Sequence, residues 1–151
     1  IITPHPGEMA RLLPRSSFID AGCPEANTGN IGERIKYLQQ NRAAAIHRFT
    51  RTSDAVIVLK GAGTLIGRAG SPIALSPFSV STLGVGGSGD VLAGICAALC
   101  ASGMESLDAA CLAVHLHGRA GEILAGQRPR GHLAREIADA VPLVWEELSG
   151  N

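Results

Sequence analysis

The chain has 151 residues, of which 46% are hydrophobic and 17% charged, and its 13 Lys and Arg residues balance its 13 Asp and Glu residues. This composition is typical of one globular domain with a sizeable core and excludes a disordered chain. The zero net charge gives no support to a nucleic-acid-binding or membrane-surface role, and no apolar run approaches the roughly 20 residues that a membrane span needs.

The chain opens inside an apolar run, and Ile1–Thr3 is predicted to be the end of a strand. Two prolines, Pro4 and Pro6, then force an extended turn. Residues 8–13 predict a helix, with Glu8 favourable in its first turn. Because the first residue is Ile and not Met, we expect the earlier strands of the sheet to come from a missing N-terminal segment or a companion chain.

Residues 14–40 predict a long surface segment without regular structure, because Gly, Pro, Asn and Ser recur throughout it. A helix is expected over residues 41–49, with Asn41 as its cap. The next run, Ala55–Leu59 with the sequence AVIVL, predicts a strand buried on both faces, since it is continuous and rich in β-branched residues.

The rest of the chain predicts two further strands and three helices. The strands are expected at 64–67 and 73–75, and the helices over residues 91–100, from a cap at Ser106, and over 132–148 with an interruption at Pro142. Strands interleaved with helices predict an α/β layered sheet, with residues 1–151 in a single domain.

The four cysteines, Cys23, Cys96, Cys100 and Cys111, lack the spacing of metal ligands, so no metal site is predicted. Cys96 and Cys100 lie four residues apart in an apolar helical stretch, where cysteine usually serves as a small core residue. Unpaired core cysteines fit a reducing compartment, and we therefore expect the protein in the cytoplasm.

The stretch Gly84–Asp90, GVGGSGD, formally contains the dinucleotide-binding pattern GxGxxG. That pattern requires a strong strand before it and an acidic residue at the end of a second strand about 20 residues later. Neither is present, because the preceding residues are SPFSVSTL and the region near Asp108 predicts a helix. A P-loop is excluded as well, since no Lys-Ser/Thr follows the glycines.

Phosphoryl chemistry fits this stretch better. The glycines lead into a helix, so the free backbone amides of four residues would converge on one point with the helix dipole behind them: Gly86, Gly87, Ser88 and Gly89. Such an anion hole stabilises the charge on a transferring phosphoryl group. Asp90 at its rim can accept the proton of an attacking hydroxyl. The alternative is a glycine-rich turn whose Asp merely starts a helix.

Three motifs in a fixed order carry a family resemblance: TPHPGE at 3–8, VLKGAGT at 58–64 and GGSGDVLAGI at 86–95. With DAACLAVHLHGRAG at 108–121, they resemble the ADP/ATP-dependent NAD(P)H-hydrate dehydratases of the ribokinase-like superfamily. The match extends over nearly all of the chain but corresponds to the C-terminal part of the family domain. The resemblance therefore implies the C-terminal portion of a ribokinase-like three-layer α/β/α sandwich.

The resemblance also implies an activity. Members of this family remove the hydroxyl group from the hydrated nicotinamide ring of damaged NADH or NADPH, by phosphorylating it with ADP or ATP and eliminating phosphate. Mg²⁺ is expected to bridge the phosphates without a dedicated protein cage. The expected partners are thus hydrated NADH or NADPH and an adenine nucleotide, and we also expect a homo-oligomer.

By position, the resemblance implies that His5 contacts the hydrated dinucleotide and that Asp90, the catalytic residue, contacts its hydroxyl. The nucleotide would be bound by Lys60, Gly61, Ala62, Gly63 and Thr64, with Gly89 at its phosphates. From the residues alone, Lys60 is either a phosphate ligand at the end of a strand or a solvated lysine. His5 is either a ligand contact or a lone surface histidine, and Glu8 is either functional or a helix-start acid.

One segment departs from the family pattern. The family usually has an Asn-x-Gly-Met stretch before the glycine loop, whereas Val80 and Thr82 occupy the corresponding positions here. This departure falls where contacts with the substrate ring are expected. Two other functions stay open: a kinase of the same superfamily acting on a vitamin-precursor alcohol, and a non-catalytic nucleotide-binding module.

Overall fold

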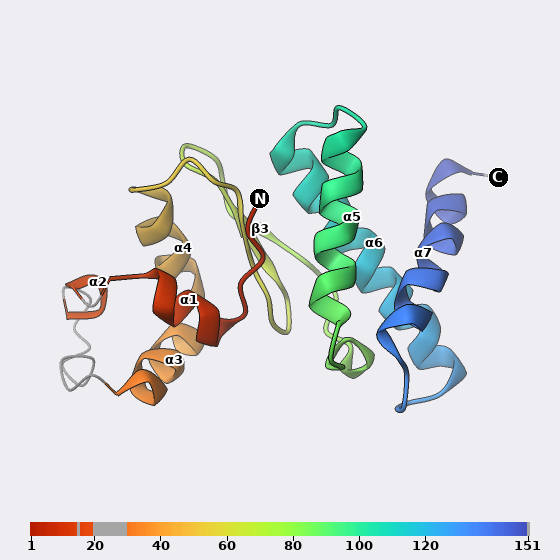
Figure 1. Cartoon of the computed structure of the whole chain (residues 1–151), viewed down its shortest axis with the longest axis horizontal. Helices are drawn as coiled ribbons and strands as arrows, with labels where there is room; N and C mark the ends of the chain where they lie inside the picture. Colours follow the sequence, from red (N-terminus) through yellow and green to blue (C-terminus); the bar gives the residue numbers. More distant parts are fainter. Residues whose placement is uncertain (15, 20–29, 151) are drawn as a thin grey trace.

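The computed structural model describes residues 1–14, 16–19 and 30–150 and arranges them in three layers (Figure 1). The middle layer is a sheet of β1 (Ile57–Leu59), β2 (Leu65–Gly67) and β3 (Ala74–Leu75). One outer layer holds α1 (Pro6–Leu12), the short α2 (Ser16–Ile19), α3 (Ile31–Gln40) and α4 (Arg42–Thr50). The other holds α5 (Ser88–Ala101), α6 (Ser106–Gln127) and α7 (Ala134–Ser149), and a 3₁₀ turn at Ser81–Leu83 precedes it.

The three strands are antiparallel neighbours in the order β1-β2-β3. A fourth segment joins β1 on its other side, where Ile2 forms a parallel bridge with Ile57. The Ile2 N–H donates to the Val56 carbonyl at 2.9 Å, and the Val58 N–H donates to the Ile2 carbonyl at 2.9 Å. The predicted strand end at residues 1–3 is therefore confirmed as a single bridge.

The side chains of β1 alternate between two separate cores. Val56 and Val58 pack into the core formed with α5, α6 and α7, whereas Ile57 and Leu59 pack into the core formed with α1, α3 and α4. All four are buried, which confirms the prediction of a strand covered on both faces. The α/β three-layer prediction is confirmed by the same arrangement.

The prediction of an irregular segment over 14–40 is wrong at both ends that the structure describes, because α2 lies at Ser16–Ile19 and α3 runs from Ile31 to Gln40. The polar residue that suggested a loop is its cap, because the Asn30 side chain accepts the Gly32 N–H at 2.9 Å. Residues 15 and 20–29, with Cys23 among them, lie outside the described part of the chain.

The helix of residues 42–50 is confirmed, but Asn41 at its start makes no capping bond; its side-chain amide donates to the Tyr37 carbonyl instead. The cap of α6 is Glu105 and not Ser106, since the Glu105 carboxylate accepts the Leu107 N–H at 2.9 Å. Glu105, one residue before Ser106, thus places a full negative charge at the Leu107 amide, where the helix dipole favours it.

The last helix is continuous, whereas an interruption at Pro142 was expected. Proline removes one helical hydrogen bond, the one to the carbonyl four residues earlier. Here that carbonyl belongs to Ala138, and both residues are exposed, so water can replace the lost donor. None of the helices within the described residues combines the length and the apolar character that crossing a membrane requires.

The described cysteines are all free thiols, and they differ in burial. Cys96 is buried and Cys111 is half-buried, as expected of core residues. Cys100 is exposed, so its prediction as a core residue is wrong. It lies with Ala93 and Ala97 on the face of α5 next to Ile1, where a shallow notch separates the helix from the edge of the sheet.

Candidate functional site

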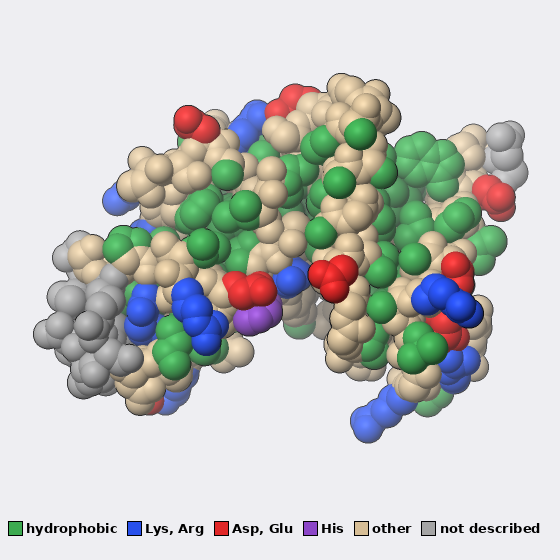
Figure 2. All heavy atoms as spheres, viewed as in Figure 1, with side chains coloured by type: hydrophobic (Ala, Val, Ile, Leu, Met, Phe, Trp, Pro, Cys, Tyr) green, Lys and Arg blue, Asp and Glu red, His purple; other side chains and the backbone are tan. Residues whose placement is uncertain are grey.

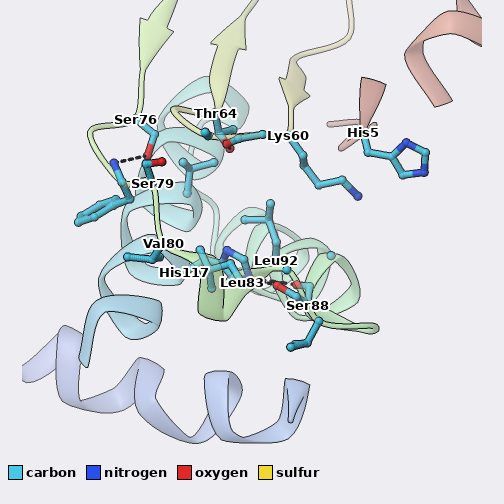
Figure 3. A pocket seen from close by; sticks show the side chains of 18 of the residues that line it. His5, Lys60, Thr64, Ser76, Ser79, Val80, Leu83, Ser88, Leu92 and His117 are labelled. Carbon is cyan, nitrogen blue, oxygen red and sulfur yellow. Dashed lines mark hydrogen bonds between the residues drawn. The ribbon is translucent and has the colours of Figure 1, made fainter. Parts of the chain in front are cut away.

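A cavity of about 740 Å³ lies between the two helix layers and brings the three sequence motifs together. Figure 2 shows the molecule hollowed there, with histidine, acidic and basic side chains at the rim. In Figure 3, His5 and Lys60 approach from one side, and Ser88, His117 and Leu83 lie opposite them. The predicted site residues that line the cavity are His5, Lys60, Gly61, Ala62, Thr64, Gly87, Ser88, Gly89 and Asp90; Gly63 and Gly86 do not line it.

The loop after β1 is bound to α4 through hydrogen bonds from Arg42. The Arg42 guanidinium donates to the Leu59 carbonyl and to the Ala62 carbonyl, both at 2.8 Å. Gly61 and Gly63 have φ of +153° and +61°, values that favour glycine. This backbone course places Lys60 and Thr64 on the cavity side of the loop (Figure 3).

The glycine loop turns into α5 at Gly87, whose φ is +85°. The Gly87 carbonyl accepts the N–H groups of Asp90 and Val91, each at 3.1 Å, and the helix therefore begins at Ser88, three residues before the predicted start. The helix has no side-chain cap.

Four residues were predicted to form the anion hole, and three of them have unpaired backbone amides. Within the described residues, the amides of Gly86, Gly87 and Gly89 donate to no acceptor. Ser88 differs, because its N–H donates to the Val85 carbonyl at 3.2 Å. Unpaired amides at the start of a helix favour a bound anion.

The ammonium group of Lys60 lies against this helix start. A Cβ added at Gly89 would lie 2.8 Å from Lys60 Nζ, so the glycine leaves room for the lysine. The same Nζ is 3.8 Å from Glu8 Oε2. A positive charge beside unpaired amides is the arrangement that a phosphate group requires.

His5 caps α1 and its ring is thereby fixed in orientation. Its Nδ1 accepts the N–H groups of Gly7 at 3.0 Å and Glu8 at 3.2 Å, and Glu8 Oε2 accepts the His5 N–H at 2.7 Å. This last bond, aided by Lys60, lowers the pKa of Glu8. Glu8 therefore lies in the first turn of the helix, as one of the two interpretations predicts, and it also pairs with Lys60. The other ring nitrogen of His5, Nε2, lies 3.5 Å from Glu8 Oε1 and is the ring atom that makes no hydrogen bond to the cap.

Among the described residues that line the cavity, Asp90 is the one that carries a carboxylate. It is exposed, and no described residue donates a hydrogen bond to its side chain or pairs with its charge. A carboxylate without a partner can accept a proton from a ligand that reaches it. This geometry is compatible with a general base beside the helix start.

The wall opposite Lys60 is packed directly on α6. A Cβ at Gly118 would collide with the Phe78 ring, and one at Gly121 would lie 2.7 Å from Leu83 and 2.9 Å from Val80. Thr82 is buried, and its hydroxyl donates to the Gly121 carbonyl at 2.8 Å. Of the two departures from the family pattern, Val80 therefore lines the cavity, whereas the Thr82 hydroxyl is bound to α6.

The sequence did not predict a role for Arg42, which holds the loop after β1, or for His117, which contacts the glycine loop. His117 lies on α6, lines the cavity and is within 3.0 Å of two Ser88 atoms. His115 lies on a different side, where its ring contacts the edge of Phe78, as the spacing of the two histidines predicts. The contacts of Arg42 with Ala62 and of His117 with Ser88 join residues far apart in sequence, so no local pattern predicts them. For His117, only the resemblance of residues 108–121 to a family helix indicated that its helix borders the site.

Metal ligands are scarce at the cavity. Within residues 1–14, 16–19 and 30–150, no three His, Cys, Asp or Glu side chains are grouped so as to hold an ion. In the same part of the chain, Asp90 supplies the one carboxylate that lines the cavity. These residues fit a Mg²⁺ ion that arrives on the phosphates of a nucleotide, and they do not fit a dedicated protein cage.

Comparison with known proteins gives consistent results. A family model described as NAD(P)H-hydrate dehydratase matches residues 1–143. A bifunctional NAD(P)H-hydrate repair enzyme from Moorella thermoacetica is 35% identical over 98% of this chain and 25% of its own length. An ADP-dependent (S)-NAD(P)H-hydrate dehydratase from Neisseria meningitidis is 34% identical over 93% of this chain and 42% of its own.

Solved structures show the same fold. The ADP/ATP-dependent NAD(P)H-hydrate dehydratase of Bacillus subtilis, co-crystallised with ATP and Mg²⁺ and soaked with CoA, superposes with a TM-score of 0.74 at 30% identity. The match covers 96% of this chain and 47% of that one. The chain thus spans between a quarter and a half of the length of these relatives.

Proposed function

This chain belongs to the NAD(P)H-hydrate dehydratase family, and we propose that it carries the nucleotide site and the catalytic base of an enzyme that uses ADP or ATP to dehydrate hydrated NADH or NADPH. We propose further that residues 1–151 are the C-terminal part of a single ribokinase-like domain. The coverage of the relatives supports a partial domain, since the match covers 96% of this chain and 47% of the Bacillus subtilis structure.

One observation carries the proposal: unpaired amides, a lysine ammonium and an unpaired carboxylate meet at a single cavity. The amides of Gly87 and Gly89 and the ammonium of Lys60 supply positive potential for a phosphoryl group. Asp90 follows Gly89 directly in α5, lines the same cavity and is available as a base. A structural turn would not need both of these features at once.

The proposed mechanism begins with the nucleotide held along the loop Lys60–Thr64. The terminal phosphoryl group lies at the amides of the glycine loop, and Asp90 accepts the proton of the ring hydroxyl as its oxygen attacks phosphorus. The bond from phosphorus to the rest of the nucleotide breaks as the new bond forms, so ADP leaves AMP behind and ATP leaves ADP. The phosphorylated oxygen then departs with its phosphoryl group as orthophosphate when its bond to carbon breaks, and the adjacent ring carbon loses a proton to water, which restores the dihydropyridine. Mg²⁺ bound to the phosphates supplies charge neutralisation for the transfer.

The substrate is proposed to lie between His5 and the helix start. His5 Nδ1 is occupied by the cap of α1, so Nε2 is the atom that would contact the hydrated dinucleotide. The proposal also includes assembly as a homo-oligomer. It further places the protein in the cytoplasm, and this location is supported by the free thiols of Cys96, Cys100 and Cys111, which suit a reducing compartment.

The test uses the full-length protein with hydrated NADPH, Mg²⁺ and ADP or ATP, and follows both the recovery of NADPH absorbance and the release of orthophosphate. Asp90→Asn should lower turnover by roughly 10²–10⁴-fold while the Kd for nucleotide stays within about twofold, because a base and not a phosphate ligand is removed. Unchanged turnover in this variant would exclude Asp90 as the base.

The same assay separates the two other functions. A small-molecule kinase would convert a vitamin-precursor alcohol to a stable phosphoester and would release no orthophosphate. A non-catalytic module would bind ADP and turn over neither substrate. The second of these is favoured by the segment before the glycine loop, in which Val80 and Thr82 replace the usual Asn and Gly and the Thr82 hydroxyl is bound to α6.

A further inference from the structure

His117 is a buried polar residue beside the glycine loop that the proposed mechanism does not use. Its ring is 7% exposed and Ser88, its partner, is 3% exposed. His117 Nε2 lies 3.0 Å from Ser88 Oγ and 3.0 Å from the Ser88 carbonyl oxygen. One nitrogen therefore faces both polar groups of the residue that begins α5 (Figure 3).

The contact with the carbonyl assigns the proton of the ring to Nε2, because a carbonyl oxygen can only accept a hydrogen bond. The Ser88 hydroxyl can donate or accept, and it therefore fits this assignment without deciding it. Burial lowers the pKa of His117, which keeps the ring neutral and leaves Nδ1 without a proton. No described residue pairs with Nδ1, and it is not among the buried unpaired atoms, so it is open to the cavity that His117 lines.

The Ser88 carbonyl belongs to the same peptide unit as the Gly89 N–H. In a planar trans peptide these two groups point in opposite directions. A donor that holds the carbonyl on the α6 side therefore turns the N–H away from α6. That N–H is one of the three unpaired amides of the loop, and it belongs to the residue whose Cα is flanked by Lys60 Nζ.

We propose that His117 is a positioning residue for the anion site: by donating from Nε2 to the Ser88 carbonyl, it fixes the Ser88–Gly89 peptide unit and aims the Gly89 amide at the bound phosphate. This inference rests on the proposed nucleotide site. His117 itself touches neither phosphate nor substrate in this arrangement, and its contribution is to the orientation of the amide.

The test compares His117→Leu, which has no donor, with His117→Gln, whose side-chain N–H can reach the same carbonyl. Isothermal calorimetry on the full-length protein with ADP measures the Kd, and urea unfolding measures stability. His117→Leu should raise the Kd about tenfold, the equivalent of one hydrogen bond, and His117→Gln should restore most of it. A lower stability with an unchanged Kd in His117→Leu would mean a structural role alone and would overturn the proposal.

A second measurement does not depend on either variant folding. In ¹⁵N NMR spectra of the wild-type protein, His117 should show a neutral ring protonated at Nε2, and addition of inorganic phosphate or ADP should shift the Gly89 amide resonance. A ring protonated at Nδ1 would overturn the proposal. If the wild-type protein binds no nucleotide, the proposed function fails, and the ring tautomer still decides whether His117 holds the Ser88 carbonyl.

Discussion

Replacing Gly89 with alanine would add a methyl group 2.8 Å from the present position of Lys60 Nζ. That separation is shorter than real Cβ contacts, so the ammonium group must move away from the helix start. The backbone of Gly89 is helical and not left-handed, and so the alanine itself is not strained. Gly89→Ala therefore displaces the lysine and leaves the helix intact.

Two energies follow, and they have opposite signs. Alanine in a helix is more stable than glycine by about 0.5–1 kcal/mol, so the free energy of unfolding should stay level or rise. A hydrogen bond from a charged donor contributes about 1.5–3 kcal/mol, and partial loss of the Lys60 contact should raise the Kd for ADP roughly 10–100-fold. Binding and stability are thus expected to change in opposite directions.

The assay is calorimetric titration of the full-length protein with ADP, together with urea unfolding. Gly94→Ala is the matched control, because Gly94 lies in the same helix with nothing within 4 Å of its added Cβ. The control should gain similar stability and keep the wild-type Kd. A wild-type Kd in Gly89→Ala, or an equal loss of affinity in Gly94→Ala, would refute the placement of the phosphates beside Lys60.

Two further predictions concern α6. Gly118→Ala should lower the free energy of unfolding by about 1–3 kcal/mol, because the methyl group would displace the Phe78 ring. Gly126→Ala is the control and should not lower it, because its added methyl group meets open space. Equal urea midpoints for the two variants would contradict the packing of Phe78 on Gly118. Burial lowers the pKa of His117 below its ordinary 6.5, so the unfolded chain is protonated at this residue at a higher pH than the folded protein. The stability contributed by the neutral ring is therefore complete above pH 6.5 and is lost as the pH falls towards the folded-state pKa. The fall in unfolding free energy between pH 7 and the folded-state pKa should be smaller in His117→Gln, and parallel curves would exclude this residue as the cause.

Local patterns predicted the elements whose signal lies in their own residues. The run Ala55–Leu59 is apolar throughout, with three β-branched residues at its centre, and β1 lies inside it, buried on both faces. The sequence does not predict the helix over 31–40, because Asn30 and Gly32 are typical of loops, although together they form its cap. The apolar residues Ile31, Ile35 and Leu38, spaced by four and three, were the signal that could have identified it.

The site was predictable as a set of residues and not as an arrangement. The glycine loop, Lys60 and Asp90 were expected at one site, and they do line one cavity. The cap made by His5 was missed because histidine is not among the usual capping residues. The contacts of Arg42 with Ala62 and of His117 with Ser88 join residues 20 and 29 positions apart, and no local pattern reports such pairs.

The alternation of side chains between two cores along Val56–Leu59 has a consequence for how the two helix layers are coupled. Among the described residues, the two core clusters on either side of the sheet have no buried side chain in common, and between them lie three strands of three, three and two residues. A ligand in the cavity would contact α1 and the β1–β2 loop on one side and α5 and α6 on the other. Its binding free energy would then link the two layers, so that amide hydrogen exchange in α1 and α5 slows together when the cavity is filled.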